Sequence, residues 1–130
     1  MSLLEDIISY FKSEGLIEGD GVDAFRDFKP ESPDNIVSLH EYKGDPISPY
    51  TDVVHRSVQV LVRNSSATAA KELANKLFSS LRKHDGAQRI NLTGERWGQI
   101  HLRQAPFKIS QDEKNRTHYG FNLGITTITD

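Results

Sequence analysis

Regular alternation between apolar and polar residues near the C-terminus is the feature that most limits how this chain can fold. A period of two residues is typical of a β-strand with one buried face. The apolar side holds Tyr119, Phe121, Leu123 and Ile125, and the opposite side holds His118, Gly120, Asn122 and Thr126. The pattern predicts a sheet that buries one face within this chain, while its small and polar face meets water or another subunit.

The last third of the chain is expected to form three consecutive strands. Their residue ranges are 88–94, 99–109 and 116–129. The polar segment 110–115 joins the last two strands as the tip of a hairpin. Trp97 falls between the first two strands, where it fits a plug at the end of the core or an anchor in an interface.

The first half of the chain adds further strands. Residues 52–63 alternate clearly, and one face of this strand consists of Val54, Val58, Val60 and Val62. Residues 35–42 are expected to form a second strand, and residues 22–28 fit a short one. Glycine and proline punctuate the loop 43–51 between the two longer strands.

Two amphipathic helices are expected, at residues 2–14 and 66–83. Ser2 and Glu5 have the spacing of a capping box at the start of the first helix. Its apolar stripe is Leu4, Ile7, Ile8 and Phe11, and that of the second is Leu73, Leu77, Phe78 and Leu81. The second stripe is expected to pack on the Val58, Val60 and Val62 face of the sheet. The chain is therefore predicted to be a single α+β domain, residues 1–130, with two helices packed on one face of a mostly antiparallel sheet.

Composition excludes several classes of function. The chain has no cysteine, which rules out disulfides, zinc–thiolate sites and thiol catalysis. Its formal net charge of −2 argues against a dedicated nucleic-acid binder. No segment has the length and hydrophobicity of a membrane span, and no secretory signal is recognisable, so a cytoplasmic location is expected. No phosphate-binding glycine loop or G-x-S-x-G motif is present, and no cofactor is expected.

A nuclease-like pattern runs from Pro33–Asp34 to Glu41 and Lys43. It spells the PD…ExK motif, in which an Asp, a Glu and a Lys converge on Mg²⁺. Asp34 and Glu41 are an odd number of residues apart, so on one strand they would point to opposite faces. These residues are therefore predicted not to form a metal site. A small Mg²⁺-dependent nuclease is kept as the alternative function.

Histidines raise a second possibility of metal binding. The chain has five, at positions 40, 55, 84, 101 and 118. His55, His101 and His118 fall on the more polar faces of their predicted strands, and three histidines on one sheet face are able to bind zinc. Because no two histidines have a metal-ligand spacing, separate surface or interface histidines are the favoured interpretation.

A family resemblance emerges when three segments are taken together. They are residues 33–44, the strand and helix containing His55–Val60 and 67–81, and the hairpin 112–116 with the strand that follows it. In this order they resemble the minor capsid, or tail terminator, proteins of long-tailed bacteriophages. The likeness covers most of the chain, but it is less clear in the first 30 residues.

The resemblance implies a structural role rather than an enzymatic one. Proteins of this family assemble into a ring, commonly a hexamer, at the head-proximal end of the tail. The ring stops polymerisation of the tail tube and joins the tail to the head. The expected partners are other copies of the chain, the tail tube protein and the head–tail connector, with nucleic acid at most passing through the ring. The expected location is the virion, after assembly in the host cytoplasm.

Contacts with these partners are expected on loops, which rigid scaffolds commonly present for binding. Tyr50 in the loop 43–51 is a candidate anchor. Arg56 belongs to a scattered basic set with Arg63, Arg103 and Lys108, which is expected to be solvated or interfacial. The segment 110–115 is predicted to be a flexible, charged projection that orders on docking. The full set of candidate interface residues is Tyr50, Arg56, Asp112, Glu113, Lys114 and Arg116.

Overall fold

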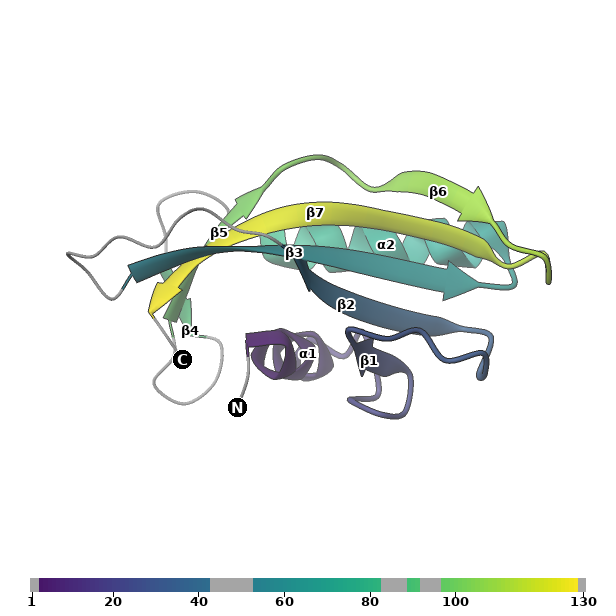
Figure 1. The fold of residues 1–130 in the computed structure, drawn as a ribbon, viewed down its shortest axis with the longest axis horizontal. Helices are drawn as coiled ribbons and strands as arrows, with labels where there is room; N and C mark the ends of the chain where they lie inside the picture. Colours follow the sequence, from purple (N-terminus) through teal and green to yellow (C-terminus); the bar gives the residue numbers. More distant parts are fainter. Residues whose placement is uncertain (1–2, 43–52, 83–88, 92–96, 129–130) are drawn as a thin grey trace.

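A computed structural model describes residues 3–42, 53–82, 89–91 and 97–128 of the chain (Figure 1). Within these residues the helices are α1 (Leu3–Ser13) and α2 (Ala67–Arg82), and the strands are β1 (Ala24–Arg26), β2 (Ile36–Tyr42), β3 (Val53–Asn64), β4 (Arg89–Asn91), β5 (Trp97–Leu102), β6 (Phe107–Gln111) and β7 (Thr117–Ile128). The predicted α+β class is confirmed. The predicted loop 43–51 and the capping residue Ser2 lie outside the described residues.

The long strands β3 and β7 form the centre of one sheet. They pair antiparallel over twelve consecutive positions, from Val53 opposite Ile128 to Asn64 opposite Thr117. The strand order is β1-β2-β3-β7-β5-β4, and β6 also pairs with β7. Among the described strands only β1 and β2 run parallel, so the sheet is mostly antiparallel, as expected.

The predicted strand at residues 99–109 is wrong, because the structure divides it into two. β5 and β6 pair with different parts of the same edge of β7 (Figure 1). The backbone N–H of Arg103 still donates to the carbonyl of Asn122 at 3.1 Å, and the chain then leaves the ladder. Pro106 lies in the gap and has no N–H to donate, so it interrupts the pairing at this edge.

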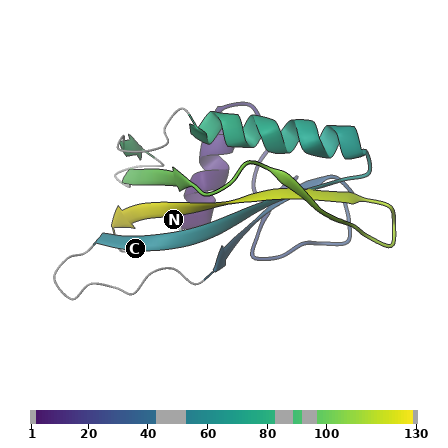
Figure 2. The same ribbon diagram turned by 90° about the horizontal axis from the view of Figure 1, so that it is seen from above.

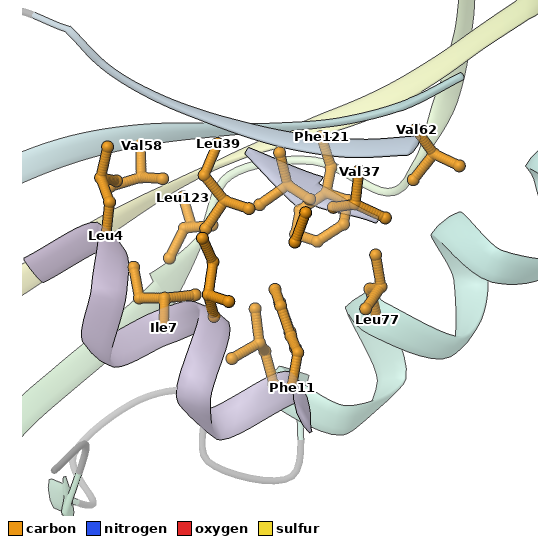
Figure 3. Packing of buried hydrophobic residues seen from close by; sticks show 14 of the residues in the cluster. Leu4, Ile7, Phe11, Val37, Leu39, Val58, Val62, Leu77, Phe121 and Leu123 are labelled. Carbon is orange, nitrogen blue, oxygen red and sulfur yellow. The ribbon is translucent and has the colours of Figure 1, made fainter. Parts of the chain in front are cut away.

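Both helices cover the same face of the sheet (Figure 2; Figure 3). α1 ends before Gly15, whose φ of +74° lies in the left-handed region that favours glycine. α2 begins after Ser66, whose hydroxyl accepts a hydrogen bond from the Ala69 N–H at 3.2 Å. These local signals place the ends of the helices close to where the sequence predicts them.

The core lies between this pair of helices and the apolar face of the sheet (Figure 3). Leu77 and Leu81 of α2 are at most 1% exposed, and the Phe78 ring meets Phe121 edge to face at a centroid distance of 5.5 Å. Buried sheet residues facing the helices include Val37, Leu39, Val58, Val60, Val62, Phe121, Leu123 and Ile125. The predicted packing of the second helix on the valine face is confirmed.

The opposite face of the sheet is less open than predicted, because the chain's own side chains cover part of it. His118 and Thr126 are only 8% and 7% exposed. Arg103 extends across Gly124 and donates to Ser57 Oγ at 3.1 Å and to the Tyr42 hydroxyl at 3.2 Å. A glycine in β7 provides room for this long side chain against the backbone. Neither α1 nor α2 has the length and hydrophobicity of a membrane-spanning helix.

Candidate functional site

The turn between β6 and β7, residues 112–116, contains most of the predicted interface residues and is called the hairpin tip here. Asp112 organises this turn with its carboxylate. One oxygen, Oδ1, accepts the backbone N–H groups of Lys114 and Arg116, each at 3.0 Å. The other, Oδ2, accepts Arg116 Nε at 2.8 Å and lies 3.0 Å from His118 Nε2. An aspartate that accepts backbone N–H groups two and four positions later fixes the shape of a turn.

Arg116 connects the hairpin tip to residues 30–34, which form the 30–34 loop before β2. Its side chain is 5% exposed. Its Nη1 donates to the carbonyl of Glu31 at 2.8 Å and lies 3.4 Å from Asp34 Oδ1. The tip is therefore attached to a segment more than eighty residues away in the chain.

Arg63 at the end of β3 donates hydrogen bonds to the backbone of the same loop. Its Nη2 donates to the carbonyls of Pro30 at 2.6 Å and Pro33 at 2.8 Å, and its Nε donates to that of Asp34 at 3.0 Å. Arg63 is only 4% exposed, and backbone carbonyls are its direct partners. A planar guanidinium with five donors is suited to gathering several carbonyls in this way.

Hydrogen bonds and nearby positive charges stabilise the ionised form of two carboxylates, those of Asp112 and Glu31. Burial alone would raise the pKa of Asp112, but the hydrogen bonds from His118, Arg116 and the backbone lower that pKa well below its ordinary value. A hydrogen bond from Lys114, together with its charge, lowers the pKa of Glu31. Burial, followed by the charge of Arg116, lowers the pKa of Arg63. The tip and the 30–34 loop therefore form one charged, internally bonded unit.

The predicted interface residues of the tip now separate into two kinds. The side chains of Asp112 and Arg116 make hydrogen bonds to other groups of the same chain. Glu113 and Lys114 are exposed, and Lys114 Nζ makes an exposed ion pair with Glu31 at 3.0 Å. The tip was predicted to be a flexible projection, whereas these bonds define one conformation. Figure 1 shows this unit at the end of the sheet where β2 begins and β3 ends.

The other two predicted interface residues, Arg56 and Tyr50, are not part of the hairpin tip. Arg56 is in β3, and its guanidinium forms a bidentate ion pair with Glu41 of the neighbouring strand β2. Arg56 Nη2 lies 2.8 Å from Glu41 Oε2. Its side chain is 22% exposed. Tyr50 lies outside the described residues. The structure thus brings the four tip residues together and leaves Arg56 apart from them.

Comparison with known protein families identifies the family of this chain. The sequence model of the bacteriophage tail terminator protein family matches residues 12–128. The chain belongs to this family. The match covers all seven described strands and α2, and it omits most of α1, in the region where the resemblance was less clear. A comparison with curated proteins found no match. As a tail terminator family member, the chain is a structural protein of the phage tail and a component of the virion.

The nuclease-like residues are not assembled into a site. Asp34 precedes β2 and lies beside Arg116, whereas Glu41 is near the opposite end of β2 and pairs with Arg56. Seven residues of extended chain separate them by roughly 20 Å. Lys43 lies outside the described residues. Within the described ranges no group of three or more histidine, aspartate or glutamate residues is placed to hold a metal ion.

The histidines of the helix-free face make hydrogen bonds within the chain, and two of them share one threonine hydroxyl. His55 Nδ1 lies 2.7 Å from Thr126 Oγ1, and His101 Nε2 lies 3.5 Å from the same hydroxyl. His118 is bound to Asp112 at the tip, and His40 Nε2 lies 2.9 Å from Ser38 Oγ. His84 lies outside the described residues. Where the structure describes them, the histidines are hydrogen-bonded structural residues.

Sequence reasoning missed two arginines that shape these surfaces. Arg63 and Arg103 were grouped with scattered basic residues, yet one holds the 30–34 loop and the other extends over the helix-free face. A usable signal for Arg63 was its place at the end of a strand of buried valines. Arg103 offered no comparable signal, because its partners Ser57 and Tyr42 come from distant strands.

Proposed function

We propose that this chain forms a ring at the head-proximal end of the tail, where it stops polymerisation of the tail tube and joins the tail to the head. The family match over residues 12–128 carries this proposal. The ring is a homo-oligomer, with six copies as the expected number. Its other partners are the tail tube protein and the head–tail connector. Assembly takes place in the host cytoplasm, and DNA at most passes through the ring.

The hairpin tip is the surface that we assign to one of these partners. Hydrogen bonds that the Asp112 carboxylate accepts and contacts between Arg116 and the 30–34 loop support its shape. A surface that is already ordered loses less conformational entropy when it binds than a flexible one does. Glu113 and Lys114 present charges of both signs on this support, so the contact is expected to weaken as salt increases.

Tyr50 and Arg56 remain proposed contacts of a different kind. Arg56 belongs to β3 and Tyr50 precedes that strand in the sequence, so both are distant in sequence from the tip. The Arg56–Glu41 pair is partly exposed and offers a charged group for a partner to meet. Two separate contact regions suit a ring subunit that meets the tube on one side and the connector on the other.

The test uses a phage that lacks the gene for this chain. We expect its lysate to contain tails of irregular, excessive length without heads. Adding the purified chain is expected to restore uniform tails and their joining to heads, as seen by electron microscopy. Tails of normal length that join heads without the chain would overturn the proposal.

The contribution of the tip is tested by exchanging its two exposed charges, with Glu113→Lys and Lys114→Glu together. The matched control exchanges two adjacent exposed charges on α2, with Lys71→Glu and Glu72→Lys. Neither change alters the net charge. We expect the tip variant to lose joining and the α2 variant to retain it, while both keep the melting temperature of the wild type. Equal joining by both variants would exclude the tip as a contact.

A further inference from the structure

We propose that neighbouring copies in the ring meet edge to edge, with the β6 edge of one copy contacting the β1 edge of the next. This inference rests on the proposed ring and names the two surfaces that would build it. The β6 edge is defined as residues 103–111, and the β1 edge as residues 18–28. Figure 1 shows β6 and β1 along opposite margins of the sheet.

The β6 edge exposes apolar side chains on a strand that is paired on one side. Phe107 and Ile109 are 41% and 42% exposed, and every residue of β6 is exposed. Among the described strands β6 pairs only with β7, so backbone groups on its other side face outward. Ile109 is also held in place, because it lies over Gly120 and beside Leu61. The apolar atoms are therefore presented by a fixed part of the fold.

The β1 edge carries a second pair of exposed apolar residues. Val22 and Phe28 are 54% and 57% exposed. The Phe28 ring packs against Phe25 at a centroid distance of 6.0 Å. Its neighbour Asp27 donates its N–H to the Leu39 carbonyl at 2.8 Å and accepts the Glu41 N–H at 3.1 Å through its side chain. These bonds fix the backbone next to Phe28.

Charge favours contact between unlike edges. The β6 edge contains Lys108 and no carboxylate, and its other basic residue, Arg103, places its guanidinium over the helix-free face. The β1 edge contains four carboxylates (Glu18, Asp20, Asp23 and Asp27) and one arginine. Contact between two β6 edges would bring like charges together, and so would contact between two β1 edges. Contact of one edge with the other is heterologous, and repetition of a heterologous contact generates a ring when the rotation closes. The occupant of the β6 edge is therefore another copy of this chain.

Side chains, rather than a continuous intermolecular sheet, make this contact. The backbone of Ala24 in β1 is already used, since its N–H donates to the Gly19 carbonyl at 3.3 Å and its carbonyl accepts the Gly21 N–H at 2.8 Å. Little of the outer side of β1 is left for strand addition. Phe107 and Ile109 would instead pack against Val22 and Phe28, with Lys108 facing the carboxylates.

The absence of native cysteine allows a direct test by thiol cross-linking. Lys108→Cys and Val22→Cys are made singly and together in the full chain and treated with a short bismaleimide. On denaturing gels we expect a ladder of covalent multimers from the double variant, dimers from a mixture of the two single variants, and monomers from either single variant alone. The reaction is run on the purified chain and on tails that it has capped in an extract.

The native mass and the capping of tails are measured in the same samples. Ring formation is therefore tested independently of the contact between the β6 edge and the β1 edge. Rings that form and cap tails without any ladder would overturn the edge assignment and leave the proposed function standing. Self-cross-linking of the Lys108→Cys variant alone would also overturn it, because that result requires like edges to meet. A ladder absent from both the purified chain and the capped tails rejects the assignment whatever the native mass is.

Discussion

Arg116 is joined to Asp112 twice, by its backbone and by its side chain. The backbone N–H donates to Oδ1 at 3.0 Å, and Nε donates to Oδ2 at 2.8 Å. The same guanidinium then reaches the Glu31 carbonyl at 2.8 Å. One ion pair thus shapes the hairpin tip and attaches it to the 30–34 loop, which makes the geometry of the tip depend on tertiary contacts.

Replacing this carboxylate tests how far it supports the tip. Asp112→Ala leaves the backbone N–H groups of Lys114 and Arg116 without their acceptor and removes the nearest of three carboxylates around a buried guanidinium. We expect a lower melting temperature and loss of joining of tails to heads. The Glu113→Ala variant serves as the control and is expected to melt like the wild type. Unchanged melting and joining in Asp112→Ala would show that the turn forms without this carboxylate.

The packing of α2 on the sheet predicts a large effect of a core truncation. Leu77 is fully buried, so Leu77→Ala removes apolar contacts and leaves a cavity. The expected loss is about 2–5 kcal/mol in the free energy of unfolding. Lys76→Ala on the exposed side of the same helix should change it by less than about 0.5 kcal/mol. Urea titration monitored by circular dichroism measures the free energy of unfolding of both variants. A loss below about 0.5 kcal/mol for Leu77→Ala would contradict the assigned packing.

The two glycines of β7 are expected to differ in their tolerance of a methyl group. A Cβ at Gly120 would lie 2.7 Å from the Val60 carbonyl oxygen, whereas one at Gly124 would first meet the end of the Arg103 side chain at 3.1 Å. Backbone cannot move away as a flexible side chain can. Gly120→Ala should therefore cost about 1–3 kcal/mol of stability. Gly124→Ala should cost clearly less in the same denaturant titration, and equal losses would refute this reason.

His40 predicts a pH dependence of stability on the acid side of neutrality. Burial, followed by the charge of Lys29, lowers its pKa below the ordinary value of 6.5, although Asp27 acts in the opposite direction. As the pH decreases through about 6.5, His40 binds a proton in the unfolded chain but stays neutral in the folded chain. The free energy of unfolding therefore falls as the pH decreases through this value. Denaturant titrations from about pH 8 to about pH 5 should show a steeper decline for the wild type than for His40→Gln. Parallel curves would argue against this role.

The separation of Asp34 from Glu41 predicts the outcome of metal titration. Glu41 is engaged by Arg56, and Asp34 lies near the other end of β2. Isothermal titration with Mg²⁺ or Mn²⁺ should therefore give no tight binding that depends on Glu41. Tight binding that disappears in Glu41→Gln would restore the nuclease alternative.

Much of the architecture could be predicted because its signals are local. The alternation in 117–128 and the stripe from Leu73 to Leu81 depend only on where neighbouring side chains point, and both elements formed as expected. The family was recognisable for a related reason, since its sequence model matches residues 12–128, a range that contains both of these elements. By contrast, the break between β5 and β6 was missed, because the length of a strand at an edge depends on its partner β7 as well as on its own residues.

The sequence by itself determined the class of the fold, the core faces of its main elements and the absence of cysteine chemistry. Tertiary structure alone decided the roles of the charged residues. Nothing local indicates that Arg63 at the end of β3 and Arg116 in the hairpin tip converge on the 30–34 loop, or that Glu41 faces Arg56. The physical reason is the range of the forces. Periodic burial follows from the geometry of one strand or helix, whereas a hydrogen bond or an ion pair needs two groups that only the folded chain brings together.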